Sequence, residues 1–405
     1  MPTTATHAVP ADPRDAALAA LADRCVMCGL CLPHCPTFAL SGVEGESPRG
    51  RIALIKLLAE ARMTLDAAAS AHLEQCLGCR RCESVCPAEV PYAELWQGAR
   101  QRWSMHTRES LASRWLKALI AHPRVLFAAL RIGSGALRLL PKAWRRRLPR
   151  LGRLLSVMAD ATPARQALSS LDSPQLWVAS ACVSGAAELA LQRRLIAALR
   201  RMGVAAEALP AGACCGAMHT HSGQAAPADP RLDPVLRSRS GQALDAAGAC
   251  VLSTASGCHS SWAQRVAPLT VQDATAFVWS LRERWPPLHP KPQRALWYAP
   301  CSQRAGNWRA APLALLTALP GLRVDPVTAT HGCCGAAGQA LLDEGERAVQ
   351  LREGLLEAIA AAQPDVVLTS NIGCAMHLRE GLLQRGLDIP VRHPLECWLE
   401  RIEEN

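Results

Sequence analysis

Cys25-Val26-Met27-Cys28-Gly29-Leu30-Cys31-Leu32-Pro33-His34-Cys35-Pro36 is the stretch that decides the fold of the first part of this 405-residue chain. The pattern returns as Cys76-Leu77-Gly78-Cys79-Arg80-Arg81-Cys82-Glu83-Ser84-Val85-Cys86-Pro87. Both stretches read C-x2-C-x2-C-x3-C-P. Three thiolates spaced three positions apart can surround one face of a cubane iron–sulfur cluster on a tight turn, and the proline turns the next segment away.

We therefore expect two [4Fe-4S] clusters with crossed sets of ligands. In runs with this spacing, which are typical of bacterial ferredoxins, the fourth Cys ligates the other cluster of the pair. The first set is Cys25, Cys28, Cys31 and Cys86, and the second set is Cys76, Cys79, Cys82 and Cys35. Zinc is the alternative, because C-x2-C pairs also bind zinc. We favour clusters, because a zinc site needs only four ligands and does not require a shared pattern of eight Cys with Pro after each fourth one.

Composition limits the class of protein. The length predicts two to four domains, and a hydrophobic content of 50% is enough for a sizeable core. Residues 1–24 lack a basic start followed by an apolar run, so we expect no export signal and a reducing compartment in which most of the 18 Cys serve metal binding. No stretch of 18 uncharged apolar residues predicts a membrane span. The expected location is the cytoplasm, with peripheral attachment to the inner face of the membrane as an option.

The net charge of +10 belongs to one segment. Residues 101–170 hold 14 Lys and Arg but only Glu109 and Asp160 as acidic residues, and they include Lys142-Ala143-Trp144-Arg145-Arg146-Arg147. Basic and apolar residues alternate there at helical spacing, and prolines divide the segment into short helices. The segment is either a basic amphipathic surface for anionic lipid or an acidic partner, or a linker with a solvated basic face. Nucleic acid is the weaker interpretation, because no nucleic-acid fold pattern accompanies the charge.

The helices around the two Cys runs can be predicted from caps and spacing. Asp12 and Pro13 suit the start of a helix over Asp12–Asp23. Helices are also expected over Ile52–Arg62 and Leu65–Gln75, and residues 37–50 are rich in Gly and Ser. These helices would pack the two Cys loops together and exclude water from the clusters.

The second half of the chain contains an internal repeat. Each copy has an apolar strand ending in Cys, a helix, a Cys-Cys-Gly turn, a second strand and a final Cys. The first copy contributes Cys182, Cys214, Cys215 and Cys258, and the second contributes Cys301, Cys333, Cys334 and Cys374. Helices are expected over Ala186–Met202 and Ala311–Leu319, and second strands over Cys250–Ser253 and Val366–Thr369. Strands that alternate with helices indicate parallel α/β units, whose ligands gather at the carboxyl ends of the strands.

The predicted fold is therefore mixed, with four parts. They are a mainly helical two-cluster ferredoxin-like domain (1–100), a basic helical connector (101–170) and two repeated α/β Cys-Cys-Gly units (171–288 and 289–405). The repeat also sorts the remaining Cys, because Cys250 aligns with Val366 and Cys397 aligns with Leu281, which assigns both to the core. The eight repeat Cys then divide into two sets of four. A redox-active pair of vicinal or cross-strand thiols is the alternative to cluster binding there.

This order of motifs resembles the iron-sulfur subunits of glycolate oxidase, over most of the chain from Cys25 to Pro394. Three further segments are similar to that family: Ser47-Pro48-Arg49-Gly50-Arg51, Thr369-Ser370-Asn371-Ile372-Gly373-Cys374 and His393-Pro394-Leu395-Glu396. Cys-Cys-Gly units also occur in relatives that serve lactate oxidation, anaerobic glycerol-3-phosphate oxidation and heterodisulfide reduction. In the heterodisulfide type the last Cys belongs to a C-x2-C pair, but Ala255 and Asn371 stand at that position here. Each unit could thus hold an ordinary cluster, a depleted one or none.

The resemblance implies an electron-transfer subunit of a glycolate, or 2-hydroxy acid, dehydrogenase complex. No flavin or nicotinamide fingerprint is visible, so FAD is expected on a partner subunit, with a quinone or another carrier as acceptor. We hypothesise that Arg80 and Arg81 raise the reduction potential of the second cluster. Alternatives are a subunit for lactate or glycerol-3-phosphate oxidation, a catalytic heterodisulfide-reductase-like subunit, and a nucleic-acid-binding module with structural clusters. No residue is predicted to be catalytic.

Overall fold

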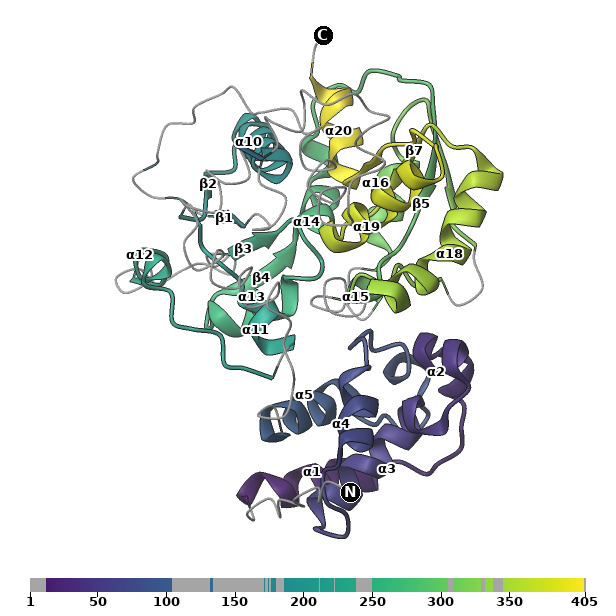
Figure 1. The fold of residues 1–405 in the computed structure, drawn as a ribbon. Helices are drawn as coiled ribbons and strands as arrows, with labels where there is room; N and C mark the ends of the chain where they lie inside the picture. Colours follow the sequence, from purple (N-terminus) through teal and green to yellow (C-terminus); the bar gives the residue numbers. More distant parts are fainter. Residues whose placement is uncertain are drawn as a thin grey trace. The chain divides into compact units, whose positions relative to one another are not determined.

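The computed structural model describes residues 12–103, 132–133, 171, 174, 176–179, 186–210, 212–221, 223–237, 250–304, 309–328, 332–337 and 345–403 (Figure 1). They fall into two compact units. Unit 1 takes its residues from Met1–Ser113, Met218–Ala226 and Ala329–Gly354, and unit 2 from Arg114–Ala217, Pro227–Thr328 and Leu355–Asn405. Cys182 and nearly all of the predicted basic connector lie outside the described residues.

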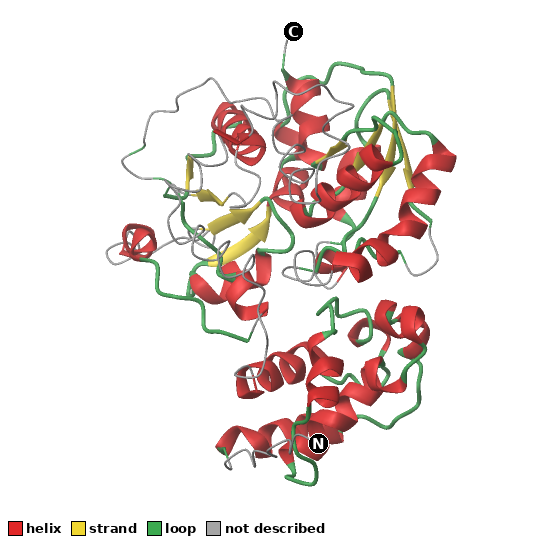
Figure 2. Ribbon diagram, in the orientation of Figure 1, coloured by secondary structure: helices red, strands yellow, loops and turns green. Residues whose placement is uncertain are grey.

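Helices make up the regular structure of the ferredoxin-like part of unit 1, as Figure 2 shows. They are α1 (Pro13–Asp23), α2 (Pro36–Ser41), α3 (Pro48–Ala59), α4 (Ala67–Glu74) and α5 (Tyr92–Trp103), with short 3-10 turns at Leu32–His34, Glu44–Glu46 and Glu83–Val85. Their apolar faces meet in one core that includes Leu18, Ile55, Leu73, Leu95 and Trp96. The two Cys runs lie in the loops that these helices connect, so the helical core fixes where both runs can be.

The helix predicted from Asp12 starts as expected, and α4 begins at Ala67, two residues after the predicted Leu65. Asp12 caps α1 through a capping box with Asp15, and Asp66 caps α4. The third prediction was wrong at its start, because α3 begins at Pro48 rather than at Ile52. The Ser47 side chain accepts a hydrogen bond from the Gly50 amide and provides a helix start that the apolar spacing did not reveal.

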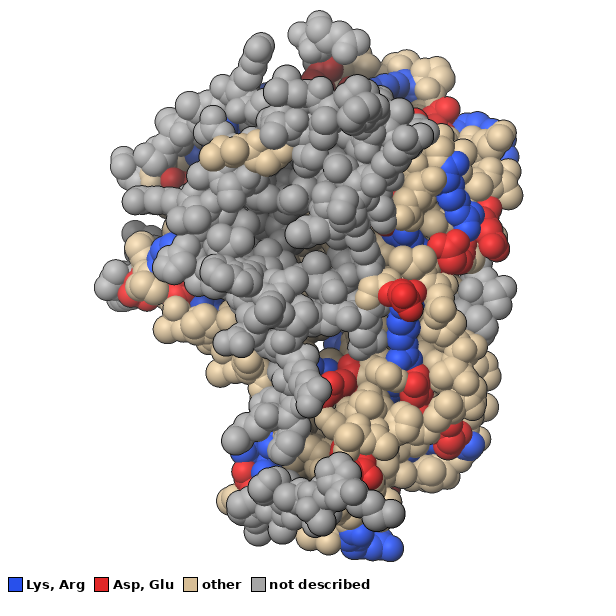
Figure 3. All heavy atoms as spheres, in the orientation of Figure 1, with Lys and Arg blue, Asp and Glu red and all other residues tan. Residues whose placement is uncertain are grey.

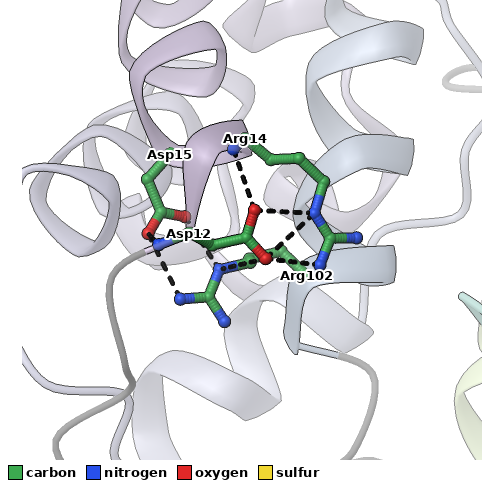
Figure 4. A network of polar contacts seen from close by, with 4 residues as sticks. All are labelled: Asp12, Arg14, Asp15 and Arg102. Atoms are coloured by element: carbon green, nitrogen blue, oxygen red, sulfur yellow. Dashed lines mark hydrogen bonds and ion pairs between the residues drawn. The ribbon is translucent and has the colours of Figure 1, made fainter.

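A polar network joins α1 to α5 (Figure 4). Arg102 Nε lies 2.8 Å from Asp15 Oδ1 and 3.7 Å from Asp12 Oδ2, and the Arg102 side chain is only 9% exposed. Hydrogen bonds from Arg14 hold the pKa of Asp12 well below its usual range. The network thus ties the first helix of unit 1 to the helix that follows the second Cys run.

Unit 2 contains two four-stranded parallel sheets with the same strand order. The first sheet is β2-β1-β3-β4, and the second is β6-β5-β7-β8. The strands are β1 (Leu176–Ala179), β2 (Ala206–Ala208), β3 (Cys250–Ser253), β4 (Thr270–Asp273), β5 (Gln293–Trp297), β6 (Leu322–Pro326), β7 (Val366–Leu368) and β8 (Val391–Arg392). This matching order confirms the internal repeat and the parallel α/β prediction.

Helices alternate with these strands along the chain. They are α10 (Ala186–Arg201), α11 (Ala217–His221), α12 (Asp233–Arg237), α13 (His259–Arg265), α14 (Ala274–Ser280), α15 (Cys301–Arg304), α16 (Ala311–Thr317), α18 (Gly345–Ala362), α19 (Ile372–Gln384) and α20 (Pro394–Ile402). Most of α11 and the first part of α18 belong to unit 1. Helices α10 and α14 of the first copy pack against α20 and α16 of the second. Both sheets therefore share one core, which contains Val178, Leu252, Trp297, Leu315 and Trp398.

Alternation along β1 explains why this central strand of the first sheet is buried on both faces. In β1, Leu176 and Val178 face the shared core, whereas Trp177 belongs to a second cluster on the other side with Trp262. Parallel strands that are covered on both faces have continuous apolar sequences. This explains why apolar runs in the sequence predict these strands.

The turns at the carboxyl ends of β3 and β7 contact each other. The Ser256 amide donates to the Ser370 carbonyl at 3.0 Å. A Cβ on Gly257 would lie 2.7 Å from Asn371 Nδ2, so only glycine fits there without a shift of the asparagine. The two Gly-Cys turns of the repeat are thus packed directly against one another in unit 2.

Charge on the described surface is mixed. On the face drawn in Figure 3, Lys and Arg side chains of described residues lie next to Asp and Glu side chains. Within the same described ranges, no helix combines the length and the apolar character needed to cross a membrane.

Candidate iron–sulfur sites

The first predicted Cys set lines one pocket of unit 1. Cys25, Cys28, Cys31 and Cys86 surround it, together with apolar side chains and Arg49. The four Cys come from the loop after α1 and from the end of the second run, as the crossed assignment requires. The structure therefore brings the whole first set together.

The second set lines a neighbouring pocket. Cys35, Cys76, Cys79 and Cys82 all contribute to it, and so does Arg51. Pro48, Cys82 and Tyr92 line both pockets and form a shared wall. Tyr92 is buried, and its hydroxyl lies 3.5 Å from Cys76 Sγ. The two sets are therefore separated by side chains rather than by a layer of secondary structure.

The two Cys loops have the same unusual backbone. Met27 and Gly29 in the first loop, and Gly78 and Arg80 at the matching positions of the second, all have φ between 56° and 82°. Such left-handed residues turn successive amide N–H groups toward one side and create the concave anion site found around phosphates and iron–sulfur clusters. Met27 and Arg80 adopt this conformation at a cost of about 1 kcal/mol each, since they carry a Cβ. Both loops are therefore shaped for an anionic group.

The Cys side chains are crowded and partly buried. Burial, followed by the neighbouring Cys76 and Cys79, raises the pKa of the Cys82 thiol, and burial raises that of Cys31. Across the described ranges, no three His, Cys, Asp or Glu side chains converge on one point as they do around a single metal ion. Each set instead surrounds a pocket, and four thiols around a pocket suit the ligation of a multi-atom cluster.

Arg51 supplies a further sign that an anion belongs in the second pocket. Its side chain is 1% exposed, yet Nη2 has no hydrogen-bond partner among the described residues. Nε donates to the His72 carbonyl at 2.7 Å, and Nη1 donates to Thr37 Oγ1 and the Glu46 carbonyl. These acceptors are all neutral. A buried guanidinium without a full set of partners is costly, so a group that completes the set fits this position. The residues of both pockets thus fit [4Fe-4S] clusters.

The two arginines of the second run differ in their surroundings. Arg80 is 42% exposed at its side chain and forms an ion pair with Glu83 at 2.7 Å. Arg81 Nη2 instead donates to the Gly332 carbonyl at 2.5 Å, next to the second Cys-Cys-Gly turn. The thiol of Cys333 is close enough for both Cys79 and Arg81 to influence its pKa, which burial raises. Within unit 1, the second Cys run therefore lies beside Cys333.

The first Cys-Cys-Gly copy brings three of its four Cys together. Hydrogen bonds with Cys214 and Cys258, together with burial, raise the pKa of the Cys215 thiol. The Cys214 amide donates to Asp229 Oδ2 at 3.2 Å, and Arg231 forms an ion pair with the same carboxylate. The fourth predicted member, Cys182, lies outside the described residues.

The second copy shows the same turn. Gly216 and Gly335 have φ values of 80° and 70°, and each amide donates to the first Cys of its turn at 3.4 Å. A Cβ on Gly335 would lie 2.2 Å from the Ala348 carbonyl oxygen, so glycine is required. Cys333 and Cys334 are part of unit 1, whereas Cys301 and Cys374 are part of unit 2, and both pairs are half-buried or buried.

The positions that would carry a fifth Cys have structural roles. Asn371 caps α19 by accepting from the Cys374 amide at 3.2 Å, and its Nδ2 donates to Ser302 Oγ. Ala255 is buried and its carbonyl accepts from Ser253 Oγ at 2.9 Å. Cys250 and Cys397 are both buried in the shared core, which confirms their assignment to packing.

Comparison with known proteins supports this organisation. Residues 21–90 match the 4Fe-4S dicluster domain, which implies two [4Fe-4S] clusters, and residues 178–262 and 295–379 each match the Cysteine-rich domain. The chain is 28% identical to the glycolate oxidase iron-sulfur subunit of Escherichia coli (strain K12), over 94% of this chain and 93% of that protein. It is 27% identical to the probable glycolate oxidase iron-sulfur subunit of Bacillus subtilis (strain 168), over 91% and 90%. Lactate utilization protein A of Anoxybacillus flavithermus is 30% identical over only 21% of this chain.

Proposed function

We propose that this chain, which is a homologue of the iron-sulfur subunits of glycolate oxidase, is the electron-transfer subunit of a complex that oxidises glycolate to glyoxylate. A flavin on a partner subunit would take the electron pair from the 2-hydroxy acid and release the electrons one at a time. The acceptor would be a quinone or another carrier. In this scheme the chain has no catalytic residue of its own.

The observation that carries this proposal is the pair of adjacent pockets in unit 1. Each pocket contains the four Cys of one crossed set, and Pro48, Cys82 and Tyr92 line both pockets. [4Fe-4S] clusters supply reversible one-electron chemistry at such sites. We assign Cys25, Cys28, Cys31 and Cys86 to one cluster and Cys35, Cys76, Cys79 and Cys82 to the other. The chain positions both groups, keeps water away with Tyr92 and the apolar lining, and provides inward-turned amides.

Proximity of the second run to Cys333 supports a path that continues beyond the two pockets. Arg81 holds the Gly332 carbonyl beside that run, within unit 1. Further iron–sulfur groups at the Cys-Cys-Gly units would extend the relay, with Cys182, Cys214, Cys215 and Cys258 in one and Cys301, Cys333, Cys334 and Cys374 in the other. A heterodisulfide-reductase-like activity is the weaker proposal, because Asn371 and Ala255 occupy the fifth-Cys positions and have structural roles.

Cys79→Ser tests the relay directly. The substitution removes one ligand of the second set, so the purified complex should lose the spectrum of one cubane and all glycolate-linked reduction of the acceptor. Cys250→Ala is the matched control, since Cys250 is buried in the shared core of unit 2 and should leave both spectra and activity intact. Iron analysis should give about eight atoms per chain for two cubanes and more if a Cys-Cys-Gly unit is filled. Full activity in a Cys79→Ser complex that lacks the cluster would exclude the relay. If the wild-type complex oxidised lactate or glycerol 3-phosphate faster than glycolate, the proposed substrate would be wrong.

A further inference from the structure

Arg49 and Arg51 are two residues apart on α3 but belong to different pockets. Arg49 lines the pocket of the first Cys set, and Arg51 lines that of the second. The Arg49 side chain is 30% exposed, and its charge is paired with Glu44 at 2.7 Å. Arg51 is buried, and its partners among the described residues are two backbone carbonyls and one hydroxyl. The two pockets are therefore electrostatically unequal.

Among the described residues, no carboxylate forms an ion pair with Arg51. Glu46, whose carboxylate acts on the Arg51 charge, forms an ion pair with Arg347. Cys76, Tyr92 and Cys35 are the other ionisable groups that face the guanidinium. Nη2 remains without a partner among the described residues, although the side chain is more than nine-tenths buried. An anion in the second pocket would provide both the missing acceptor and the missing negative charge.

We propose that Arg51 is the positioning residue that makes the second Cys set the electron-accepting end of the pair: its Nη2–H donates to sulfur at that site, and its charge stabilises the reduced state there. This inference rests on the proposed relay. One electron leaves the group held by the first set, which is oxidised, and one electron arrives at the group held by the second set, which is reduced. A reduced cluster carries one more negative charge than an oxidised one, so a buried cation beside it raises its reduction potential. Arg49 also acts on Cys31 and Cys25 of the first set, but its charge is paired with Glu44 and partly exposed, so solvent screens it more than that of Arg51.

Arg51 is a separate candidate from Arg80 and Arg81, whose influence on this site stays a prediction. The charge of Arg80 is paired with Glu83 and partly exposed, and Arg81 is engaged with the Gly332 carbonyl. Arg51 is far from the Cys runs in sequence, but it lies in the wall of the second pocket.

A redox titration of the full complex with chemical mediators, followed by electron paramagnetic resonance, tests the inference without glycolate. The signal of the second set is the one that Cys79→Ser removes. Arg51→Gln should lower the equilibrium constant for electron transfer from the first set to the second at least about tenfold, which is 59 mV for a one-electron couple. Arg49→Gln, the matched control on the same helix, should leave the second-set potential unchanged.

Arg51→Lys distinguishes the effect of the charge from the effect of the hydrogen bond on the potential. It also provides a second variant in case Arg51→Gln loses the cluster. Lysine keeps the charge but lacks the planar fork, so the second-set potential should fall by less than in Arg51→Gln. An unchanged second-set potential in Arg51→Gln overturns the proposal. If Arg51→Gln does not retain that cluster, an unchanged potential in Arg51→Lys overturns the hydrogen bond to sulfur. Failure of glycolate to reduce either wild-type cluster would instead refute the proposed function and leave the effect of Arg51 on potential measurable.

Discussion

The contacts of His393 make the free energy of unfolding depend on pH. It caps α20, where Nδ1 accepts from the Leu395 amide at 3.2 Å, and Nε2–H donates to the Thr254 carbonyl at 2.8 Å. The neutral ring therefore satisfies both partners, and a protonated ring would point a second N–H at an amide N–H. The side chain is 7% exposed, and burial lowers the pKa of His393 to about 4, against a smaller opposite effect of the Thr254 carbonyl. The neutral form is thus part of the native fold of unit 2.

The sign and size of the effect follow from proton binding. An unfolded histidine has a pKa of about 6.5, so below that pH the unfolded chain binds a proton that the native state rejects. Stability from this residue is complete above pH 6.5 and is lost as the pH falls toward 4. Between pH 7.5 and pH 5.5 the loss is about 1.4 kcal/mol, or tenfold in the unfolding equilibrium.

Anaerobic urea unfolding of wild type and His393→Asn at the two pH values measures this loss. The destabilisation caused by the substitution should be larger at pH 7.5 than at pH 5.5 by about 1.4 kcal/mol. Asp273→Asn is the control of opposite sign, because burial raises the pKa of Asp273 to about 6 despite the amides that it caps. Its destabilising effect should instead be about 0.8 kcal/mol smaller at pH 7.5 than at pH 5.5. Equal effects of His393→Asn at both pH values would refute the neutral-cap reasoning.

Two further substitutions test the local geometry. Gly335→Ala places a Cβ 2.2 Å from the Ala348 carbonyl oxygen, whereas Gly42→Ala, at a similar positive φ of 66°, meets nothing within 4 Å. Chemical unfolding should show Gly335→Ala to be about 1–3 kcal/mol less stable than Gly42→Ala, and equal stability would contradict the steric clash. Arg102→Gln removes the hydrogen bond to Asp15 and should cost about 1.5–3 kcal/mol, measured as a lower urea midpoint at pH 7.5; an unchanged midpoint would show that the α1–α5 network contributes nothing.

The sequence allowed the prediction of features that depend on local spacing. The C-x2-C-x2-C-x3-C-P pattern is enough to place four Cys around each pocket, and the apolar strands with their repeat are enough to predict two parallel sheets. Asp12 and Pro13 also specify the start of α1 by local chemistry. The start of α3 was missed, because apolar periodicity begins at Ile52 although Ser47 already caps the helix. For α3, the capping residue indicates where the helix starts, whereas the apolar spacing does not.

Features that depend on distant residues could not be predicted in the same way. Nothing in the sequence indicates that Arg51 is enclosed by Thr37 and His72, or that Arg81 donates to Gly332. Arg81 directly follows Arg80, and Arg51 lies two residues after Arg49. Arg80 and Arg49 each form an ion pair at the surface, but charge pattern alone treats the members of each pair as equivalent. Tertiary packing separates the members of each pair: Arg51 is buried whereas Arg49 is partly exposed, and Arg81 is half-buried whereas Arg80 is exposed.

The segment Ser47-Pro48-Arg49-Gly50-Arg51 shows how one short stretch can distinguish two similar sites. Ser47 caps the helix, and Pro48 then forms part of the wall between the pockets. A Cβ on Gly50 would lie 2.0 Å from a backbone carbonyl oxygen of the preceding turn, so glycine is needed for the helix to begin there. This tight start directs Arg49 to the first pocket and Arg51 to the second. The same helix start therefore gives one partly exposed, paired charge at Arg49 and one buried charge at Arg51. Both sites have four Cys ligands, so the electrostatic difference between them comes from the fold and not from the ligands.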